Sequence, residues 1–226
     1  MSPRQSGFSL VSMMVGLVIS LLAILGMMNL YAVIGKLAAE SGRFALMTGD
    51  RAAAVLAATQ AMHAAGYGIP NARADDHLRL CVNLTAVNGT LSGDCATGNP
   101  GNALLWRTDG SLCEGLYITQ GGDLELLEPT NCGTSGFSCT WSSAQRTRLY
   151  TAPFAGAVFT ELERRPANEP CSPFGVGDPV TGSVRVRIES HQPLVSPTDP
   201  ASSYDPSDGS TFRPINAWVC LVNFGG

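Results

Sequence analysis

Hydrophobic positions are concentrated at the start of the chain. From Ser6 to Gly35, thirty consecutive residues carry no charge, and the residues before them contain a single arginine, Arg4. A secretory signal peptide has an apolar core of only about 7–15 residues, whereas a membrane-spanning helix needs about 20 apolar residues. The pattern therefore predicts a transmembrane helix, with Arg4 keeping the N-terminal end in the cytoplasm. Cleavage by signal peptidase near "KLAAES", residues 36–41, is an alternative.

Helical spacing continues beyond this run. Residues 36–65 contain no proline and place apolar side chains near helical spacing at Phe44, Met47, Val55, Ala58 and Met62. Gly42 and Gly49 each weaken a helix by about 1 kcal/mol relative to alanine, and Gly66 is a natural stop. One helix from Phe8 to Ala65 would be about 87 Å long. The alternative is two helices, an anchor and a separate core helix.

After residue 78 the pattern changes to short strands separated by turn residues. Strands are predicted at 78–84, 103–106, 116–120, 123–127, 158–163, 184–190 and 217–223. "YITQGGDLELL" predicts a hairpin with a two-residue Gly-Gly turn. In "SVRVRIES", apolar and charged residues alternate, as in a strand with one buried face.

Composition narrows the choice of partners. The chain has 226 residues and a net charge of −4, so no overall positive field attracts nucleic acid. Arg185 and Arg187 could contact DNA phosphates, but a solvated sheet face explains them more simply. Nucleic acid is therefore not an expected partner.

Seven cysteines all follow residue 80, and no Cys-x-x-Cys pair occurs. The three histidines also lack metal-ligand spacing, so we expect structural disulfides in an oxidising compartment and no zinc site. Cys132 and Cys139 flank a short Gly/Ser/Thr loop and are the predicted local pair. Cys220 needs a distant partner, for which Cys171 is our choice. The full connectivity is not determined by the sequence.

Two further groups could carry chemistry. The segment 192–214 is rich in Pro, Ser and Asp, and Asp199, Asp205 and Asp208 within it are weak candidates for calcium ligands. Their spacing does not match an EF-hand, so a solvated loop is favoured and no cofactor is expected. Glu161 and Glu163 could form an acid pair, but an exposed charged face explains them more simply and is the favoured interpretation. No nucleophile motif or phosphate-binding loop occurs, and we predict that the protein is not an enzyme.

The stretch "GFSLVSMMVGLVIS" resembles the N-terminal signature of type IV pilins and type II secretion pseudopilins. The matching residues are Gly7, Phe8, Ser9, Leu10 and Val11, followed by the apolar helix. The resemblance implies that prepilin peptidase removes residues 1–7 by cutting between Gly7 and Phe8, and that Phe8 is then N-methylated.

The chain departs from this signature at the fifth mature position, where the family nearly always has glutamate and this sequence has Ser12. In the family, that carboxylate neutralises the N-terminal amine of a neighbouring subunit. A carboxylate at membrane depth costs about 2.5–3.5 kcal/mol on insertion scales, so it persists only for a reason. Its absence fits either a tip subunit with no subunit ahead of it or a tolerated substitution in a low-copy subunit.

A second resemblance is to the PilW-type minor pilins, in which a Gly-Arg-Phe-Ala segment precedes a helix ending in Ala-Gly-Tyr. The matching residues here are Gly42 to Ala45 and Ala65 to Tyr67. Looser matches are "ALLWRTDG", the Cys113–Gly115 segment and "GSVRVRIES".

These resemblances imply an α+β pilin fold, a long N-terminal helix packed on an antiparallel sheet with disulfide-tied loops. The expected organisation is a leader at 1–7, a transmembrane and filament-core helix at 8–35, an amphipathic second half at 36–66 and a periplasmic head at 67–226. Filament packing is assigned to Leu10, Val11, Ser12, Met14, Leu17, Val18, Leu21, Leu22 and Leu25.

The implied function is that of a minor pilin in a priming or tip complex for type IV pilus assembly, with possible adhesion or DNA contact. The implied partners are prepilin peptidase, other minor and major pilins, and the inner membrane before export into the pilus. The alternatives are a type II secretion pseudopilin at the filament tip and a single-span periplasmic binding or adhesion protein.

Overall fold

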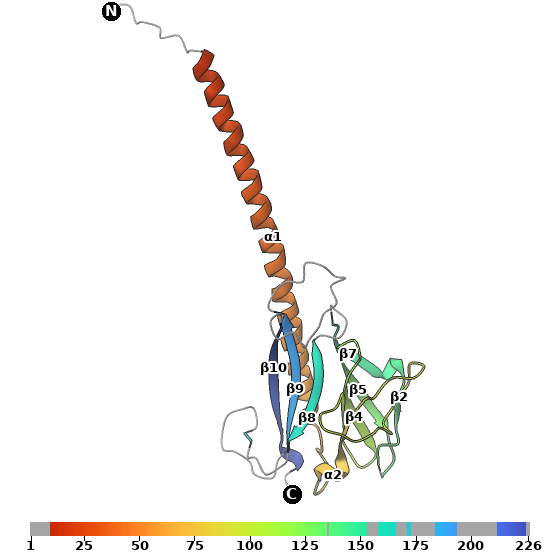
Figure 1. Ribbon diagram of the computed structural model, residues 1–226. Helices are drawn as coiled ribbons and strands as arrows, with labels where there is room; N and C mark the ends of the chain where they lie inside the picture. Colours follow the sequence, from red (N-terminus) through yellow and green to blue (C-terminus); the bar gives the residue numbers. More distant parts are fainter. Residues whose placement is uncertain are drawn as a thin grey trace, which may run out of the picture. The chain divides into compact units, whose positions relative to one another are not determined.

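The computed structural model describes residues 10–134, 136–152, 158–165, 171–172, 184–193 and 212–224 (Figure 1). The chain divides into two compact units, Met1–Met47 and Thr48–Gly226. The expected α+β class is confirmed: a long apolar N-terminal helix is combined with antiparallel sheets and disulfides.

The helix α1 runs without a break from Leu10 to His63. The prediction of one continuous helix is therefore confirmed, and the alternative of two separate helices is wrong. Neither Gly42 nor Gly49 interrupts the helix. After His63 the chain makes tighter turns, and Gly66 adopts φ +73° while its N–H donates to the carbonyl of Arg107 at 2.9 Å. This left-handed conformation is one that glycine adopts at little cost, so the helix cannot continue through it.

We expect Gly49→Ala to stabilise the protein. A Cβ atom at this position meets nothing within 4 Å, so the substitution adds about 1 kcal/mol of helix propensity without a clash. Gly66→Ala is the matched comparison and should destabilise the protein, because φ is +73° and the added atom would lie 3.0 Å from the Phe224 ring. Urea denaturation of the full-length protein in a non-ionic detergent measures both changes. A lower midpoint for Gly49→Ala would contradict this expectation.

Within the described residues, the strands form three antiparallel sheets. The five-stranded sheet has the order β1 (Leu78–Cys81), β3 (Ala103–Arg107), β4 (Leu112–Ile118), β5 (Leu124–Asn131) and β7 (Arg146–Tyr150). The three-stranded sheet has the order β10 (Phe212–Leu221), β9 (Val184–Pro193) and β8 (Phe159–Arg165). A small third sheet pairs β2 (Leu91–Ser92) with β6 (Thr140–Trp141). The short helices are α2 (Ala74–His77), η1 (Ser143–Gln145) and η3 (Val222–Phe224).

Each strand predicted from the sequence overlaps an observed one, but β2, β6 and β7 were missed. The first two are only two residues long, and β7, "RTRLY", has too few apolar positions to show alternation. β10 begins at Phe212, earlier than predicted, and includes Pro214. Proline is tolerated there because β10 is the terminal strand in the order of its sheet.

The predicted Gly-Gly hairpin joins β4 to β5, but its loop is one residue longer than expected. The N–H of Thr119 donates to the carbonyl of Asp123 at 3.0 Å, which leaves Gln120, Gly121 and Gly122 as the loop. Gly122 has φ +83°. A turn followed by a left-handed glycine is the usual three-residue hairpin connection.

Two hydrophobic clusters stabilise the unit Thr48–Gly226. In the first, Ala54, Ala58 and Met62 of α1 belong to one core with side chains of both larger sheets, such as Trp106 and Ile188. The second lies around the cysteines and includes Leu105, Phe137 and Trp141. Side chains of β3 alternate between the two clusters, so all five of its residues are buried. This explains its continuous apolar sequence.

Candidate functional site

The N-terminal half of α1 exposes the apolar side chains to which filament packing was assigned. Within the single chain their exposed fractions run from 52% at Leu21 to 73% at Leu10. Ser12 is also exposed. A surface of this kind is unfavourable in water and is typical of a segment that packs against lipid or other proteins.

Among the described residues, α1 is the helix that is long and apolar enough to cross a membrane. The hydroxyl of Ser20, within the apolar half of α1, is compatible with an apolar surrounding because it donates back to the carbonyl of Gly16 at 2.9 Å. The helix therefore fits membrane anchoring.

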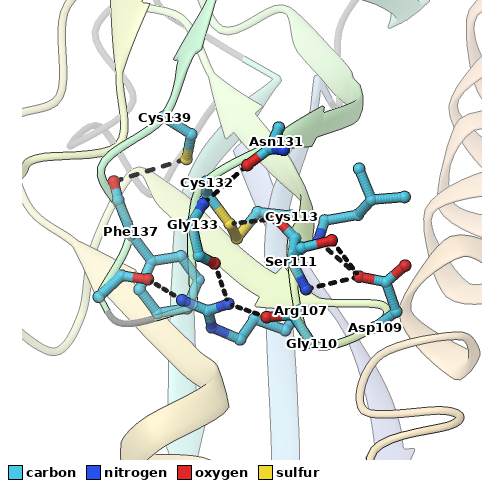
Figure 2. Close-up of a disulfide and its surroundings, with 12 residues drawn as sticks. Arg107, Asp109, Gly110, Ser111, Cys113, Asn131, Cys132, Gly133, Phe137 and Cys139 are labelled. Atoms are coloured by element: carbon cyan, nitrogen blue, oxygen red, sulfur yellow. Dashed lines mark hydrogen bonds between the residues drawn. A yellow bond between two sulfur atoms is a disulfide. The ribbon is translucent and has the colours of Figure 1, made fainter.

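Three disulfides tie the loops of the sheets: Cys81–Cys95, Cys113–Cys132 and Cys171–Cys220. The last is the distant pair chosen from the sequence. The predicted Cys132–Cys139 pair is wrong, because Cys132 is bonded to Cys113 and Cys139 is a free thiol (Figure 2). The reason is strand register: the β4–β5 pairing places Cys113 opposite Thr130, close to Cys132, and this outweighs the shorter loop to Cys139.

The thiol of Cys139 is buried beside the Cys113–Cys132 disulfide. The three sulfur atoms lie within 4.8 Å of one another, and the Cys139 thiol donates to the carbonyl of Phe137 at 3.5 Å. Burial raises the pKa of Cys139 to about 11, although the nearby Arg107 and Arg79 act in the opposite direction. The thiol is therefore protonated at neutral pH and a poor nucleophile.

Because of this raised pKa, we expect stability to fall at alkaline pH. The thiol ionises near pH 9.0 in the unfolded chain and near 11 in the folded protein, so the stabilisation is complete below pH 9 and is lost as the pH rises through 11. Two pKa units correspond to about 2–3 kcal/mol. Urea unfolding at about pH 8 and about pH 10.5 should show a smaller loss for Cys139→Ala than for the wild type. Peptide mapping of the Cys113–Cys132 bond afterwards controls for disulfide exchange, and equal losses in both proteins would refute the assignment to Cys139.

Arg107 is the second feature of this region, and sequence reasoning missed it. Although it carries a charge, its side chain is only 2% exposed. The guanidinium donates to the carbonyls of Gly110 at 2.9 Å, Gly133 at 2.7 Å and Gly136, and it lies 5.6 Å from the centre of the Phe137 ring (Figure 2). It thus joins the β3–β4 turn to the loop after Cys132. An arginine directly after the apolar run "ALLW" was the available signal.

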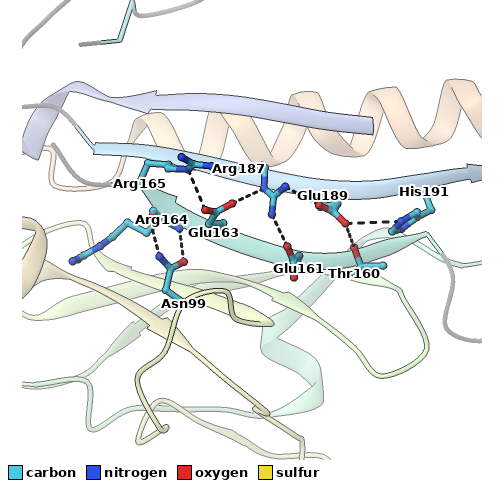
Figure 3. A network of polar contacts seen from close by, with 9 residues as sticks. All are labelled: Asn99, Thr160, Glu161, Glu163, Arg164, Arg165, Arg187, Glu189 and His191. Carbon is cyan, nitrogen blue, oxygen red and sulfur yellow. Dashed lines mark hydrogen bonds and ion pairs between the residues drawn. The ribbon is translucent and has the colours of Figure 1, made fainter. Parts of the chain in front are cut away.

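A charged network covers one face of the three-stranded sheet (Figure 3). Arg187 forms ion pairs with Glu161, Glu163 and Glu189, the last two at 2.8 and 2.9 Å. Burial raises the pKa of Glu161, with a further contribution from Glu189, while Arg187 lowers it. Glu161 and Glu163 do share a face, as the alternation predicted, and Arg187 holds both.

The two arginines considered for DNA contact both have partners within the sheet. Arg187 is held by three carboxylates, and the guanidinium of Arg185 stacks over the Trp218 ring at 4.6 Å. These contacts favour a structural role for both arginines on the face of the sheet over contact with DNA phosphates.

Several predicted sites lie outside the described residues. Gly7 and Phe8, the expected cleavage site, precede the first described residue, and Asp199, Asp205 and Asp208 lie in the undescribed segment before β10.

Taken together, a long apolar N-terminal helix, antiparallel sheets and disulfide-tied loops fit the pilin fold. The family model for the prokaryotic N-terminal methylation motif matches residues 2–28. The chain therefore carries a type IV prepilin-like signature, and Gly7, Phe8 and Ser12 fall within the matched residues. No curated protein and no solved structure shows significant similarity to the chain.

Proposed function

We propose that this chain is a minor pilin that joins a priming or tip complex and supports type IV pilus assembly. The observation that carries the proposal is the methylation motif at residues 2–28, which leads directly into an exposed apolar helix. Prepilin peptidase cuts after Gly7, the helix is stored in the inner membrane with the head in the periplasm, and the subunit then enters the pilus. The role is structural rather than enzymatic.

A minor rather than a major role is supported by two features. The chain has Ser12 at the position where the prepilin signature has glutamate, so the helix lacks a carboxylate to neutralise a neighbour's N-terminal amine. The residues from Gly42 to Tyr67 also resemble the PilW-type minor subunits. A subunit without that carboxylate fits a position that no subunit precedes.

The three disulfides support a periplasmic head, since such bonds form and persist in oxidising compartments. In the proposed complex, the apolar residues Leu10 to Leu25 of α1 provide lateral packing against other minor and major pilins. The head remains available for contacts with neighbouring heads or with the environment.

The decisive experiment is deletion of the gene in the native host, followed by counting surface pili by electron microscopy. We expect few or no pili, recovery with the wild-type gene, and no recovery with Leu17→Arg. This variant places a charge on the exposed apolar face, at a cost of about 2.5–3.5 kcal/mol at membrane depth. Arg148→Gln, an exposed change in the head, is the matched control and should restore piliation.

Other outcomes would point to the alternatives. Normal piliation combined with a defect in protein secretion would identify a type II secretion pseudopilin. Retention of the whole chain in the inner membrane, with neither defect, would identify a single-span periplasmic protein.

To locate the subunit, Ser12→Glu can be compared with the wild type by immunogold labelling. We expect the wild type at pilus ends and Ser12→Glu along the shaft as well, whereas equal shaft labelling would show that the missing carboxylate does not determine position.

A further inference from the structure

A pocket of about 410 Å³ lies at β1, the edge strand of the five-stranded sheet. Four separate segments line it: α2 through Asp75, β1 through Arg79, the segment Thr97–Asn99, and the end of β8 through Arg164. The buried leucines on either side of Arg79 add an apolar lining. Its volume falls in the range of about 300–1,000 Å³ that is usual for small-ligand sites.

The segment Thr97–Gly101 fixes the geometry of this pocket because it is hydrogen-bonded to both sheets. On one side, the N–H of Gly98 donates to the carbonyl of Leu80 at 3.1 Å. On the other, Gly101 and Leu162 exchange two backbone hydrogen bonds of 2.8 Å. A Cβ atom on Gly101 would lie 2.2 Å from the carbonyl oxygen of Cys81, so this close approach requires glycine.

Arg164 is held in place by Asn99. The backbone N–H of Arg164 donates to Asn99 Oδ1 at 3.0 Å, and Asn99 Nδ2 donates to the Arg164 carbonyl at 2.7 Å (Figure 3). The guanidinium of Arg164 also pairs with Asp75 at 3.0 Å. The Asp75 side chain is 87% exposed, so this ion pair is a weak competitor for a ligand.

Arg79 differs from Asp75 and Arg164 in its contacts within the described residues. Within the described part of the chain, no carboxylate lies within ion-pairing distance of this half-buried guanidinium, which stacks over the Phe137 ring at 5.0 Å. Yet the unit Thr48–Gly226 has 17 acidic residues and 11 arginines, a net charge of 11 − 17 = −6. A cation at the pocket of such an acidic domain, with no carboxylate among its described contacts, can bind an external anion.

We propose that this pocket binds a carboxylate group. The planar guanidinium of Arg79 can donate two parallel hydrogen bonds to a carboxylate, and Arg164 supplies a second positive charge. Asp75 makes the charge of the lining +2 − 1 = +1, so a ligand with one negative charge neutralises it. The carboxylate is supplied either by an acidic side chain of another protein or by a small organic acid, and the proposal is independent of the role in pilus assembly.

The test is an NMR titration of the full-length protein in a non-ionic detergent, with hexanoate as the probe and hexanamide as the neutral control. We expect saturable shifts with hexanoate alone. Arg79→Gln should weaken binding at least ten-fold, because a charge-assisted bidentate contact is lost. Arg148→Gln, whose side chain is 56% exposed and not part of the pocket lining, should leave it unchanged.

A second variant keeps the proposal testable if Arg79→Gln fails to fold through loss of its contact with Phe137. Asp75→Asn removes an exposed competitor and frees Arg164, so it should strengthen hexanoate binding several-fold. Equal binding of hexanamide, unchanged affinity in folded Arg79→Gln, or unchanged or weaker affinity in Asp75→Asn would each overturn the proposal. A blocked peptide with one glutamate, compared with its glutamine counterpart, identifies the source. Binding of the glutamate peptide indicates a protein partner, and binding of hexanoate alone indicates a small organic acid.

Discussion

Replacement of Gly7 by valine is expected to abolish N-terminal processing and entry into pili. The wild-type chain should be recovered as 219 residues beginning at Phe8, since the removal of residues 1–7 leaves 226 − 7, and the N-terminal amine should carry a methyl group. The Gly7→Val chain should retain Met1. We expect this result because a branched side chain next to the proposed cleavage site is bulkier and stiffer than glycine and should hinder the peptidase.

Intact-mass measurement of the protein from membranes and from sheared pili provides the readout. Gly16→Ala is the matched control because it lies in the same apolar segment and an added Cβ meets nothing within 4 Å. It should be processed like the wild type. A wild-type chain that begins at Met1, or one that begins after residue 39, would contradict the cleavage site and favour an uncleaved anchor or a secretory signal peptide.

Replacement of Arg107 by methionine is expected to lower the free energy of unfolding by about 3–5 kcal/mol, because three hydrogen bonds from a charged donor are lost. Methionine retains much of the apolar length of the side chain, so the change in the free energy of unfolding measures mainly the lost contacts of the guanidinium. The loop from Gly133 to Cys139 should also loosen. Cys139 should then react with a thiol reagent at least ten-fold faster than in the wild type, in which the thiol is buried.

Urea denaturation and the rate of thiol labelling measure these two effects. Arg148→Met is the control, since this side chain is 56% exposed and its ion pairs with Asp123 and Glu125 are 3.9 Å long. It should cost at most about 1 kcal/mol. If both variants lose the same small amount of stability, the three carbonyl contacts of Arg107 do not stabilise the head.

Arg107 is buried and Arg148 is exposed, and this difference shows how little a sequence indicates about the surroundings of a charged residue. Both arginines lie in strands, and apart from the apolar run before Arg107 the sequence does not reveal what surrounds them. Only the loop after Cys132, which supplies two of the three carbonyls, gives Arg107 a buried position. The pocket at Arg79 likewise depends on tertiary structure, because its lining comes from four segments that are separated along the chain.

The sequence by itself determined the features that depend on short-range patterns. An uncharged run of thirty residues predicted the apolar helix, and the continued helical spacing predicted one element from Phe8 to Ala65, which the structure shows unbroken from Leu10 to His63. Short apolar runs between turn residues predicted most of the described strands. Five residues at the start of that run indicated the prepilin-like signature. These signals succeed because helix and strand periods, the length of an apolar run and a short N-terminal signature are all local properties.

Only the tertiary structure decided which distant groups meet. Short loop length favoured a Cys132–Cys139 bond, but the register between β4 and β5 brought Cys132 to Cys113 and left Cys139 as a buried thiol. In the same way, hydrogen bonds from Thr97–Gly101 to two sheets brought Arg79 and Arg164 to one pocket. Strand register and sheet packing depend on the whole set of buried contacts, so no local pattern in the chain specifies them.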